Sequence, residues 1–402
     1  MTSLNENMRT TDMFKHCPEI DSLRAIAMIA VVAMHSKLLP FGWAGVWLFF
    51  VISGYVVTLS IVKQHDPKST GPLIKAFYLR RIARIVPVYY VYVILGILIC
   101  AAIGVPLQFK ALLSIFAFYQ NTATAYGFGE MEFWSTGHLW SISVEMQFYL
   151  IYGIAAYYLS LRATRKLLWF FVFVAPLLRL IASLATENWD PLHSAYFIYS
   201  GAGFHFDSFA MGGLLALARL KMPINELVGP LVKIGCGAMA CYLAIYMGVN
   251  IVIRDRDGVE IFRDIISGIL YGDGREIFLY SALGLFSLAI LALTVARHKA
   301  IFWLVSLRPL QWIGSISYGA YIVHAVCLQI MWWLVIDNWG VTEQATMVDK
   351  LMVFAGGLAL TLIIAQISYL FLERPVMEFL KHYRSAKRIE SPIIGKSNVG
   401  RS

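Results

Sequence analysis

The sequence predicts an all-α protein that crosses a membrane many times. Of its 402 residues, 59% are hydrophobic and 14% are charged, whereas roughly 25% of residues are charged in an ordinary soluble domain. The mean hydropathy is +0.68, and the apolar residues gather in runs of about 20, the length of a membrane-spanning helix. One water-soluble core cannot bury this much apolar surface, so most helices are expected to face lipid.

Ten apolar runs are long enough to cross a bilayer, which takes about 20 residues per helix. They cover residues 20–39, 43–62, 85–104, 139–160, 166–186, 203–219, 228–250, 276–296, 312–336 and 348–372. The stretch 105–119 is apolar but shorter, and it contains Pro106 and Lys110. We therefore predict about ten transmembrane helices and one short interfacial or re-entrant helix.

The Lys and Arg residues are distributed unevenly between the two sides of these spans. If the N-terminus is cytoplasmic, 25 of the 33 lie on the cytoplasmic side and 8 on the outer side. Cytoplasmic loops of membrane proteins are enriched in these residues, so both termini are predicted to be cytoplasmic. The same clusters account for the net charge of +9, so the bilayer, and not nucleic acid, is the expected partner.

A single membrane domain is predicted over residues 20–375, between a cytoplasmic N-terminal segment, 1–19, and a basic cytoplasmic tail, 376–402. The longest outer segment, 251–275, is too short to form another domain. The five cysteines show no Cys-x-x-Cys spacing, so neither disulfides nor a metal site is expected. The polar positions of the first five spans do not recur in the last five, which argues against an inverted-repeat transporter.

The first span carries two polar residues, Arg24 and His35, and a charge inside a span costs on the order of 2.5–3.5 kcal/mol. Their separation of 11 positions is three helical turns plus roughly 20°, so both side chains leave one face about 16 Å apart. Taken singly, Arg24 fits an inner-leaflet anchor and His35 a hydrogen-bonded core histidine. The shared face favours a functional role for both.

Further polar stripes occur in later spans. In the fourth span, helical spacing puts on one face His138, Ser141, Glu145, Phe148, Tyr149 and Tyr152. In the last two spans, the corresponding faces carry Ser317, Tyr321 and His324, and then Gln366, Tyr369 and Glu373. At the entrance of span 203–219 lie His205 and Asp207. Such stripes either line a wet cavity or form hydrogen-bonded seams between helices.

Three arginines, Arg80, Arg81 and Arg84, lie on about one helical turn at the predicted cytoplasmic surface. Positive-inside bias explains such a cluster. Anion capture explains it equally well, because guanidinium groups match phosphate geometry.

At these residues the sequence resembles acyltransferase family 3, the integral-membrane O-acyltransferases that mostly acetylate sugars of bacterial surface polysaccharides. Seven motifs carry the resemblance, in the order of the family. They are L-R-A-I-A…H (23–35), G-V-W-L-F-F-V-I-S-G-Y (45–55), R-R-I-A-R-I-V-P-V-Y (80–89), H-L-W-S-I-S-V-E-M-Q-F-Y (138–149), F-D-S-F-A-M-G (206–212), I-S-Y-G-A-Y-I-V-H (316–324) and L-E-R-P (372–375). Two positions depart from the family pattern, because Trp47 and Met146 stand where the family usually has acidic residues.

The resemblance implies an O-acyltransferase of the bacterial inner membrane that takes an acyl group, by default acetyl, from cytoplasmic acyl-CoA to a hydroxyl of a lipid-linked or surface glycan. Histidine suits the removal of a hydroxyl proton, because its unperturbed pKa of about 6.5 lies near working pH. The expected catalytic residues are His35 as general base, Glu145 orienting it, and Arg24 binding the donor or polarising its thioester.

The remaining expected site residues bind the two substrates. The donor phosphates are assigned to Arg80, Arg81 and Arg84. The predicted acceptor-binding residues are His138, Ser141, Tyr149, Asp207, Ser317, Tyr321 and His324.

Several alternatives remain open. Direct transfer and an acyl-histidine relay predict the same residues, whereas a serine acyl-enzyme is disfavoured because no G-x-S-x-G motif occurs. A transporter or flippase for a sugar-containing lipid would use the same polar stripes as a pathway. A glycan ligase or polymerase is expected to have larger outer loops than this chain.

Overall fold

The computed structural model describes residues 13–63, 70–253, 255–261, 275–336 and 345–389. These residues form helices and connecting loops without a strand, which confirms the predicted all-α class. The first half contains α2 (Pro18–His35), α3 (Gly45–Val62), α4 (Thr70–Ala102), α5 (Phe109–Phe116), α6 (Gln120–Ala125), α7 (Trp140–Tyr158), α8 (Leu161–Ala185) and α9 (Pro191–Ser200). The second half contains α10 (Phe206–Ala218), α11 (Ile224–Gly248), α13 (Arg275–Val295), α14 (Lys299–Val305), α15 (Arg308–Ser315), α16 (Ser317–Ile336), α17 (Met347–Ser368) and α18 (Arg374–Ile389).

Short helical segments join several of these helices. The 3₁₀ turns are η1 (Gly42–Ala44), η2 (Gly137–Leu139) and η3 (Ala202–His205), and the π-helical turns are η4 (Val249–Ile253) and η6 (Tyr369–Glu373). Helix α5, of 8 residues, lies where the sequence predicted a short helix.

Seven helical stretches of the described chain are long and apolar enough to cross a membrane. They are Gly42–Val62, Ile74–Ala102, Leu161–Ala185, Ile224–Ile253, Ile277–Val295, Ser317–Ile336 and Met347–Leu380. The other three predicted spans also form helices, α2, α7 and α10. Of these, α10 has 13 residues, and the first turns of α2 carry Glu19, Asp21 and Arg24. The count of ten spans and their orientation therefore stay predictions.

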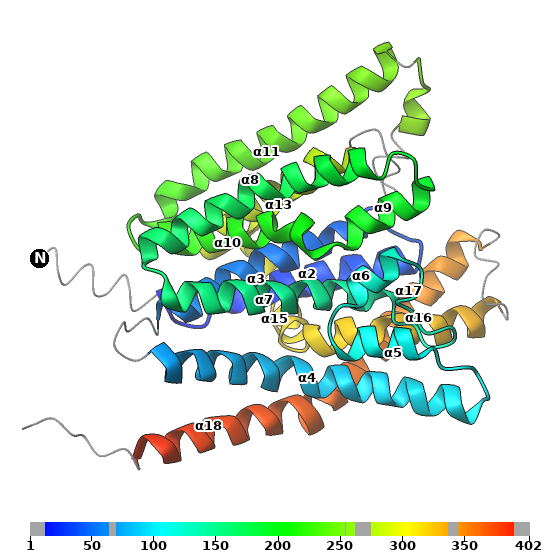
Figure 1. Cartoon of the computed structure of the whole chain (residues 1–402), viewed down its shortest axis with the longest axis horizontal. Coiled ribbons are helices and arrows are strands. Elements are labelled where there is room, and N and C mark those ends of the chain that lie inside the picture. The colour runs from blue at the N-terminus through cyan, green and yellow to red at the C-terminus, as the bar shows by residue number, and fades with distance from the viewer. Residues whose placement is uncertain (1–12, 64–69, 254, 262–274, 337–344, 390–402) are drawn as a thin grey trace, which may run out of the picture.

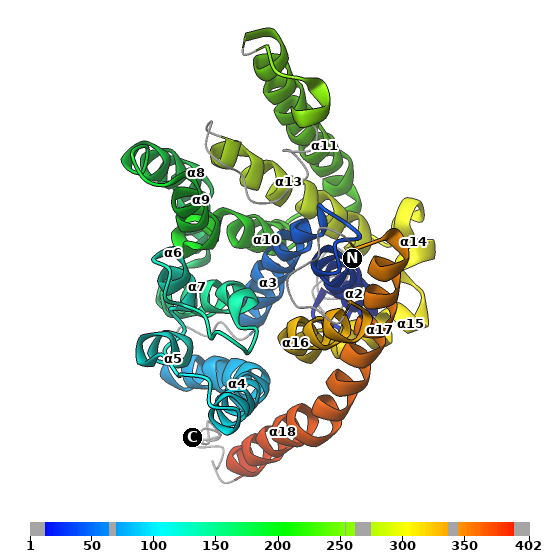
Figure 2. The same cartoon turned by 90° about the vertical axis from the view of Figure 1, so that its right-hand side faces the viewer.

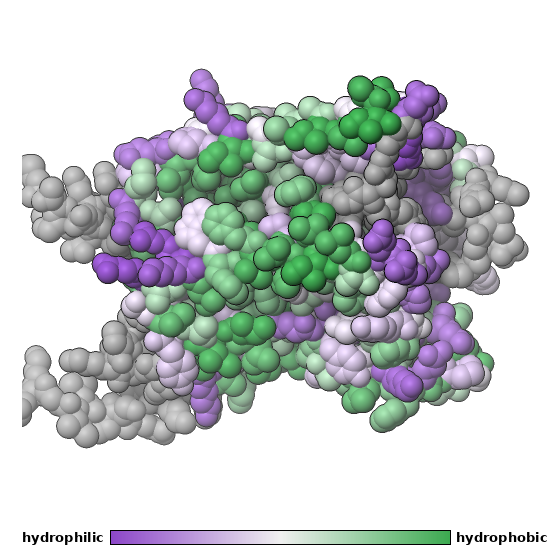
Figure 3. Space-filling view, turned by 45° about the horizontal axis from the view of Figure 1, so that its top comes forward, coloured by the Kyte–Doolittle hydropathy of each residue, from purple (hydrophilic) through white to green (hydrophobic). Residues whose placement is uncertain are grey.

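The long helices run roughly along one common direction, horizontal in Figure 1. Viewed along that direction, α2 and α3 lie in the middle of the bundle, with α4, α7, α10, α13, α16 and α17 around them (Figure 2). Apolar side chains gather mainly over the middle of the face shown in Figure 3, and hydrophilic side chains over its two ends. This distribution is the one that a bilayer around the middle of the bundle requires.

The central helices α3 and α10 pack in close backbone contact. A Cβ added to Gly54 would lie 1.9 Å from the Phe209 carbonyl oxygen, and one added to Gly212 would lie 2.0 Å from that of Val51. Small residues allow such an approach between helices in a membrane. The contact fixes α3, and with it Ser53, relative to the second half of the chain.

A buried ion pair joins α8, α10 and α13. Arg179 donates to the Asp207 carboxylate at 2.9 Å, and neither side chain is exposed to solvent. Ser281 also donates to Asp207, at 2.7 Å, and Arg179 donates to the Ile277 carbonyl at 3.1 Å. Asp207 is therefore engaged between helices, and it lies outside the set of residues that line the cavity described below. Its expected role in acceptor binding stays a prediction, to which these contacts add a structural role.

We predict that Asp207→Asn destabilises the protein, because it leaves the Arg179 guanidinium buried without a counter-charge. Breaking a buried pair in this way costs about 3–5 kcal/mol. Thermal unfolding in detergent micelles measures the effect. The matched control is Glu378→Gln, which removes the exposed i,i+4 partner of Arg374 and is expected to change the melting temperature little. Equal melting temperatures for the two variants would contradict the prediction.

Candidate active site

Five helices, α2, α3, α4, α7 and α16, line one cavity that opens to the outside, with about 730 Å³ of space when the open solvent at its mouth is included. Its lining combines apolar side chains with a few convergent polar groups, as ligand sites do. Three guanidinium groups reach it, and the polar lining residues are Arg24, Arg81, Arg84, Ser53, Ser141, Glu145, Tyr149, Ser317, Tyr318 and Tyr321. With three arginines and one carboxylate, the cavity is suited to an anionic ligand.

The structure separates the three arginines of the cluster in α4. Arg81 and Arg84 are three residues apart, so they share a helical face, and both line the cavity. Arg80 is turned by about 100° from Arg81, does not line the cavity, and has its Nη2 atom 3.4 Å from Ser60 Oγ. The predicted anion site therefore keeps Arg81 and Arg84, whereas Arg80 lies on another face.

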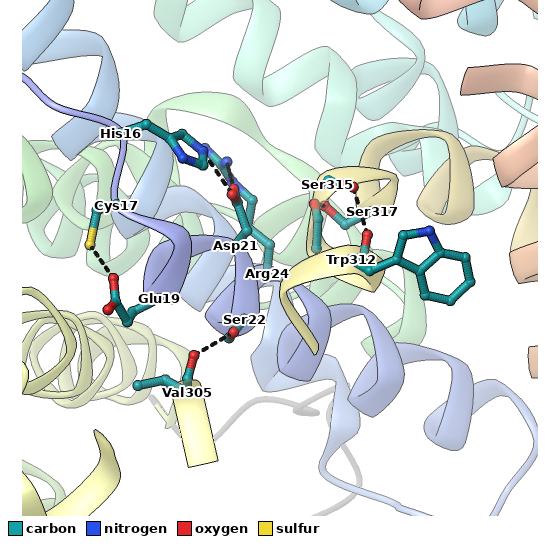
Figure 4. Close-up of polar contacts among 11 residues, drawn as sticks. His16, Cys17, Glu19, Asp21, Ser22, Arg24, Val305, Trp312, Ser315 and Ser317 are labelled. Atoms are coloured by element: carbon teal, nitrogen blue, oxygen red, sulfur yellow. Dashed lines mark hydrogen bonds and ion pairs between the residues drawn. The ribbon is translucent and has the colours of Figure 1, made fainter. Parts of the chain in front are cut away.

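Arg24 is held at the cavity by an acidic neighbour. Its Nη1 atom donates to Asp21 Oδ1 at 3.0 Å, and the two side chains are 15% and 10% exposed. The other oxygen of Asp21 lies 2.8 Å from His16 Nε2 (Figure 4). Asp21 was absent from the predicted site, although its i,i+3 spacing to Arg24 was a usable signal. The ion pair fixes Nη1 of the Arg24 guanidinium and leaves its other N–H groups free to donate to a ligand.

Glu145 has partners within the cavity wall. Its Oε1 atom accepts hydrogen bonds from Ser53 of α3 and from Tyr149, one turn along α7. The predicted orienting contact from Glu145 to His35 is absent from the hydrogen bonds of the described residues, because this carboxylate faces Ser53. Ser53 was missed by the sequence reasoning, since nothing in the local spacing of α3 reveals which helix packs against it.

Three histidines, one each from α2, η2 and α16, lie together at the other end of α2. The ring centroids of His35 and His324 are 5.1 Å apart, and those of His324 and His138 are 4.9 Å apart. His324 and His138 are buried, whereas His35 is exposed. The sequence had placed these residues in separate spans without a means to pair them. The structure brings the predicted base and two predicted acceptor-binding residues into one cluster.

Tyr321 lies between the cavity and the histidines. It lines the cavity, and its ring centroid is 5.3 Å from that of His324 and 5.8 Å from that of His138. Its hydroxyl lies 2.7 Å from Ser141 Oγ. The cavity and the histidine cluster are therefore adjacent, with one tyrosine side chain as their common wall.

Two remaining sequence features have packing partners. Ser317 lines the cavity and donates to the Gly314 carbonyl at 2.7 Å. Trp47, which replaces the usual acidic residue of the resembled family, is fully buried and stacks on Tyr280 with centroids 4.7 Å apart. A carboxylate at this position would be surrounded by aromatic rings, so in this chain the position has an apolar packing role.

The family model of an acyltransferase domain matches residues 18–370. The chain is 28% identical over 395 residues to the peptidoglycan O-acetyltransferase OatA of Listeria monocytogenes. This alignment covers 93% of the chain and 58% of the Listeria protein. It is 25% identical over 383 residues to the O-acetyltransferase OatA of Staphylococcus aureus, in an alignment that covers 90% of the chain and 57% of the Staphylococcus protein.

A putative O-acetyltransferase of Staphylococcus aureus is 27% identical over 379 residues, with 90% of this chain and 57% of that protein covered. The chain thus spans a little under three fifths of the length of these relatives. No solved structure matches it.

Proposed function

Because this chain belongs to the acyltransferase domain family, we propose that it is a membrane O-acetyltransferase. The donor is acetyl-CoA, and the acceptor is a hydroxyl of a cell-envelope glycan of the peptidoglycan type, by analogy with the peptidoglycan O-acetyltransferase of Listeria monocytogenes. The protein resides in the bacterial cytoplasmic membrane with both termini inside. One observation carries the proposal: a cavity lined by three arginines adjoins a histidine cluster, and α2 contributes a residue to each.

The arginine-lined cavity is the proposed donor site. Acetyl-CoA carries several phosphate charges, and Arg81 and Arg84 present guanidinium groups that bind phosphate oxygens. Arg24, held by Asp21, binds the carbonyl groups of the pantetheine arm. Helix geometry puts the Cα atoms of Arg24 and His35 about 16 Å apart along the axis, a span that an extended pantetheine arm covers.

The histidine cluster is the proposed site of transfer. His35 is exposed at the end of α2, so a glycan hydroxyl can approach its imidazole from outside the bundle. The thioester arrives from the cavity, past the side chain of Tyr321. This arrangement keeps donor and acceptor on opposite sides until the reacting atoms meet.

His35 acts in this mechanism as general base. It takes the proton of the acceptor hydroxyl while the hydroxyl oxygen attacks the thioester carbonyl carbon. The new C–O bond forms, the C–S bond breaks, and the imidazolium returns its proton to the departing thiolate. The products are the acetyl ester and CoA, and the histidine is neutral again.

We predict that His35→Ala lowers transfer of radiolabelled acetyl from acetyl-CoA to peptidoglycan fragments by about 100- to 10,000-fold, the usual loss for a general base. The assay uses membranes that contain equal amounts of each protein. His382→Ala, on the exposed face of α18, is the matched control and retains wild-type transfer. Unchanged transfer by His35→Ala would contradict the mechanism. If wild-type protein transferred no label from any acyl-CoA, the transport alternative would be favoured.

We predict that Arg81→Gln and Arg84→Gln each raise KM for acetyl-CoA by about 10- to 100-fold, because each removes a charge-assisted hydrogen bond. Arg80→Gln is the control and leaves KM near the wild-type value. S-acetyl-pantetheine lacks the nucleotide phosphates, so wild type and variants should use it equally well. A KM effect that persists with this truncated donor would show that the substitutions damage the fold and do not report phosphate binding.

A further inference from the structure

His324 is buried with one ring nitrogen already engaged. Its Nδ1 atom lies 2.6 Å from the Tyr321 carbonyl oxygen. A carbonyl only accepts, so Nδ1 carries the hydrogen and Nε2 presents a lone pair. Nε2 is buried and has no hydrogen-bond partner among the described residues. A buried acceptor without a partner is costly in a folded protein and indicates that a donor belongs there.

His138 cannot be that donor. Its Nε2 atom lies 2.9 Å from the Ile322 carbonyl oxygen, so Nε2 holds the hydrogen. The Nδ1 atom of His138 is therefore also a lone-pair acceptor, and it too is buried without a partner in the described structure. Two acceptors cannot satisfy each other, so the donor to His324 comes from elsewhere.

His35 is the neighbour that can donate. Its ring centroid is 5.1 Å from that of His324, and an N–H···N hydrogen bond between two imidazoles needs a centroid separation of about 5 Å. In the described part of the chain the His35 imidazole has no hydrogen bond. Its backbone is held by Trp332, which donates to the His35 carbonyl at 3.3 Å. The centroid separation is short enough for one His35 N–H to reach His324 Nε2 when the His35 ring is turned toward it.

We propose that His324 is a positioning residue for His35, in an inference that rests on the proposed function. Its Nε2 atom accepts the N–H of His35, which fixes the tautomer and leaves the other His35 nitrogen bare toward the acceptor hydroxyl. When His35 takes the hydroxyl proton, the same hydrogen bond becomes charge-assisted and stabilises the imidazolium. A neutral imidazole thus performs the orienting role that the sequence assigned to Glu145.

The test compares two side chains of similar shape at position 324, in full-length protein in membranes. His324→Gln retains an oxygen acceptor near the position of Nε2, and His324→Met does not. We expect His324→Met to lower kcat by about 10- to 100-fold, the effect of losing one hydrogen bond to a charged group, with KM for acetyl-CoA within twofold of wild type. His324→Gln is expected to regain most of that loss.

The same substitution in a His35→Ala background separates positioning from a general structural effect. If His324 acts through His35, His324→Met costs nothing further there. Wild-type kcat for His324→Met, equal losses for Met and Gln, or an undiminished loss in the His35→Ala background would each overturn the inference. If His324→Met fails to accumulate, His324→Phe takes its place with the same expectations. Wild-type transfer is measured first, so failure of the proposed function is seen separately.

Discussion

The arrangement of this protein depends on the high cost of placing polar side chains in an apolar helical bundle without partners. Arg24 and His35 leave one face of α2, so every helix that covers this face has to offer polar groups. Helix α7 supplies Ser141 and Glu145, and the η2 turn before it supplies His138. Helix α16 supplies Ser317, Tyr321 and His324. The cavity and the histidine cluster are the two places where these groups converge.

The two sites differ in electrostatic character, as the proposed use of two substrates requires. Guanidinium groups from α2 and α4 make the cavity positive, as a donor with phosphate charges requires. In the histidine cluster, His138 and His324 each direct one N–H at a carbonyl oxygen, so the other ring nitrogen of each presents a lone pair. Tyr321 lines the cavity and contacts the His324 ring, so its side chain lies where the two regions adjoin.

Helical spacing predicts what lies on one helix, and it predicted the shared face of Arg24 and His35 and the all-α class. It does not predict which helices meet. Glu145 therefore accepts a hydrogen bond from Ser53 and none from His35. Asp207 forms an ion pair with Arg179, which lies 28 positions earlier on α8. The count of ten spans stays a prediction, because α10 has 13 residues and the first turns of α2 carry Glu19, Asp21 and Arg24. The family resemblance is confirmed by the match over residues 18–370, and the site residues that it implies stay predictions.

The central claim is that donor and base meet at one end of the arginine-lined cavity. A cryo-electron microscopy structure with a non-transferable thioether analogue of acetyl-CoA tests it most directly. The account predicts the nucleotide phosphates at Arg81 and Arg84, the pantetheine arm along α2, and the acetyl carbon beyond Tyr321 beside the His35 imidazole. An analogue bound outside this cavity, or with its acetyl end remote from His35, would contradict it.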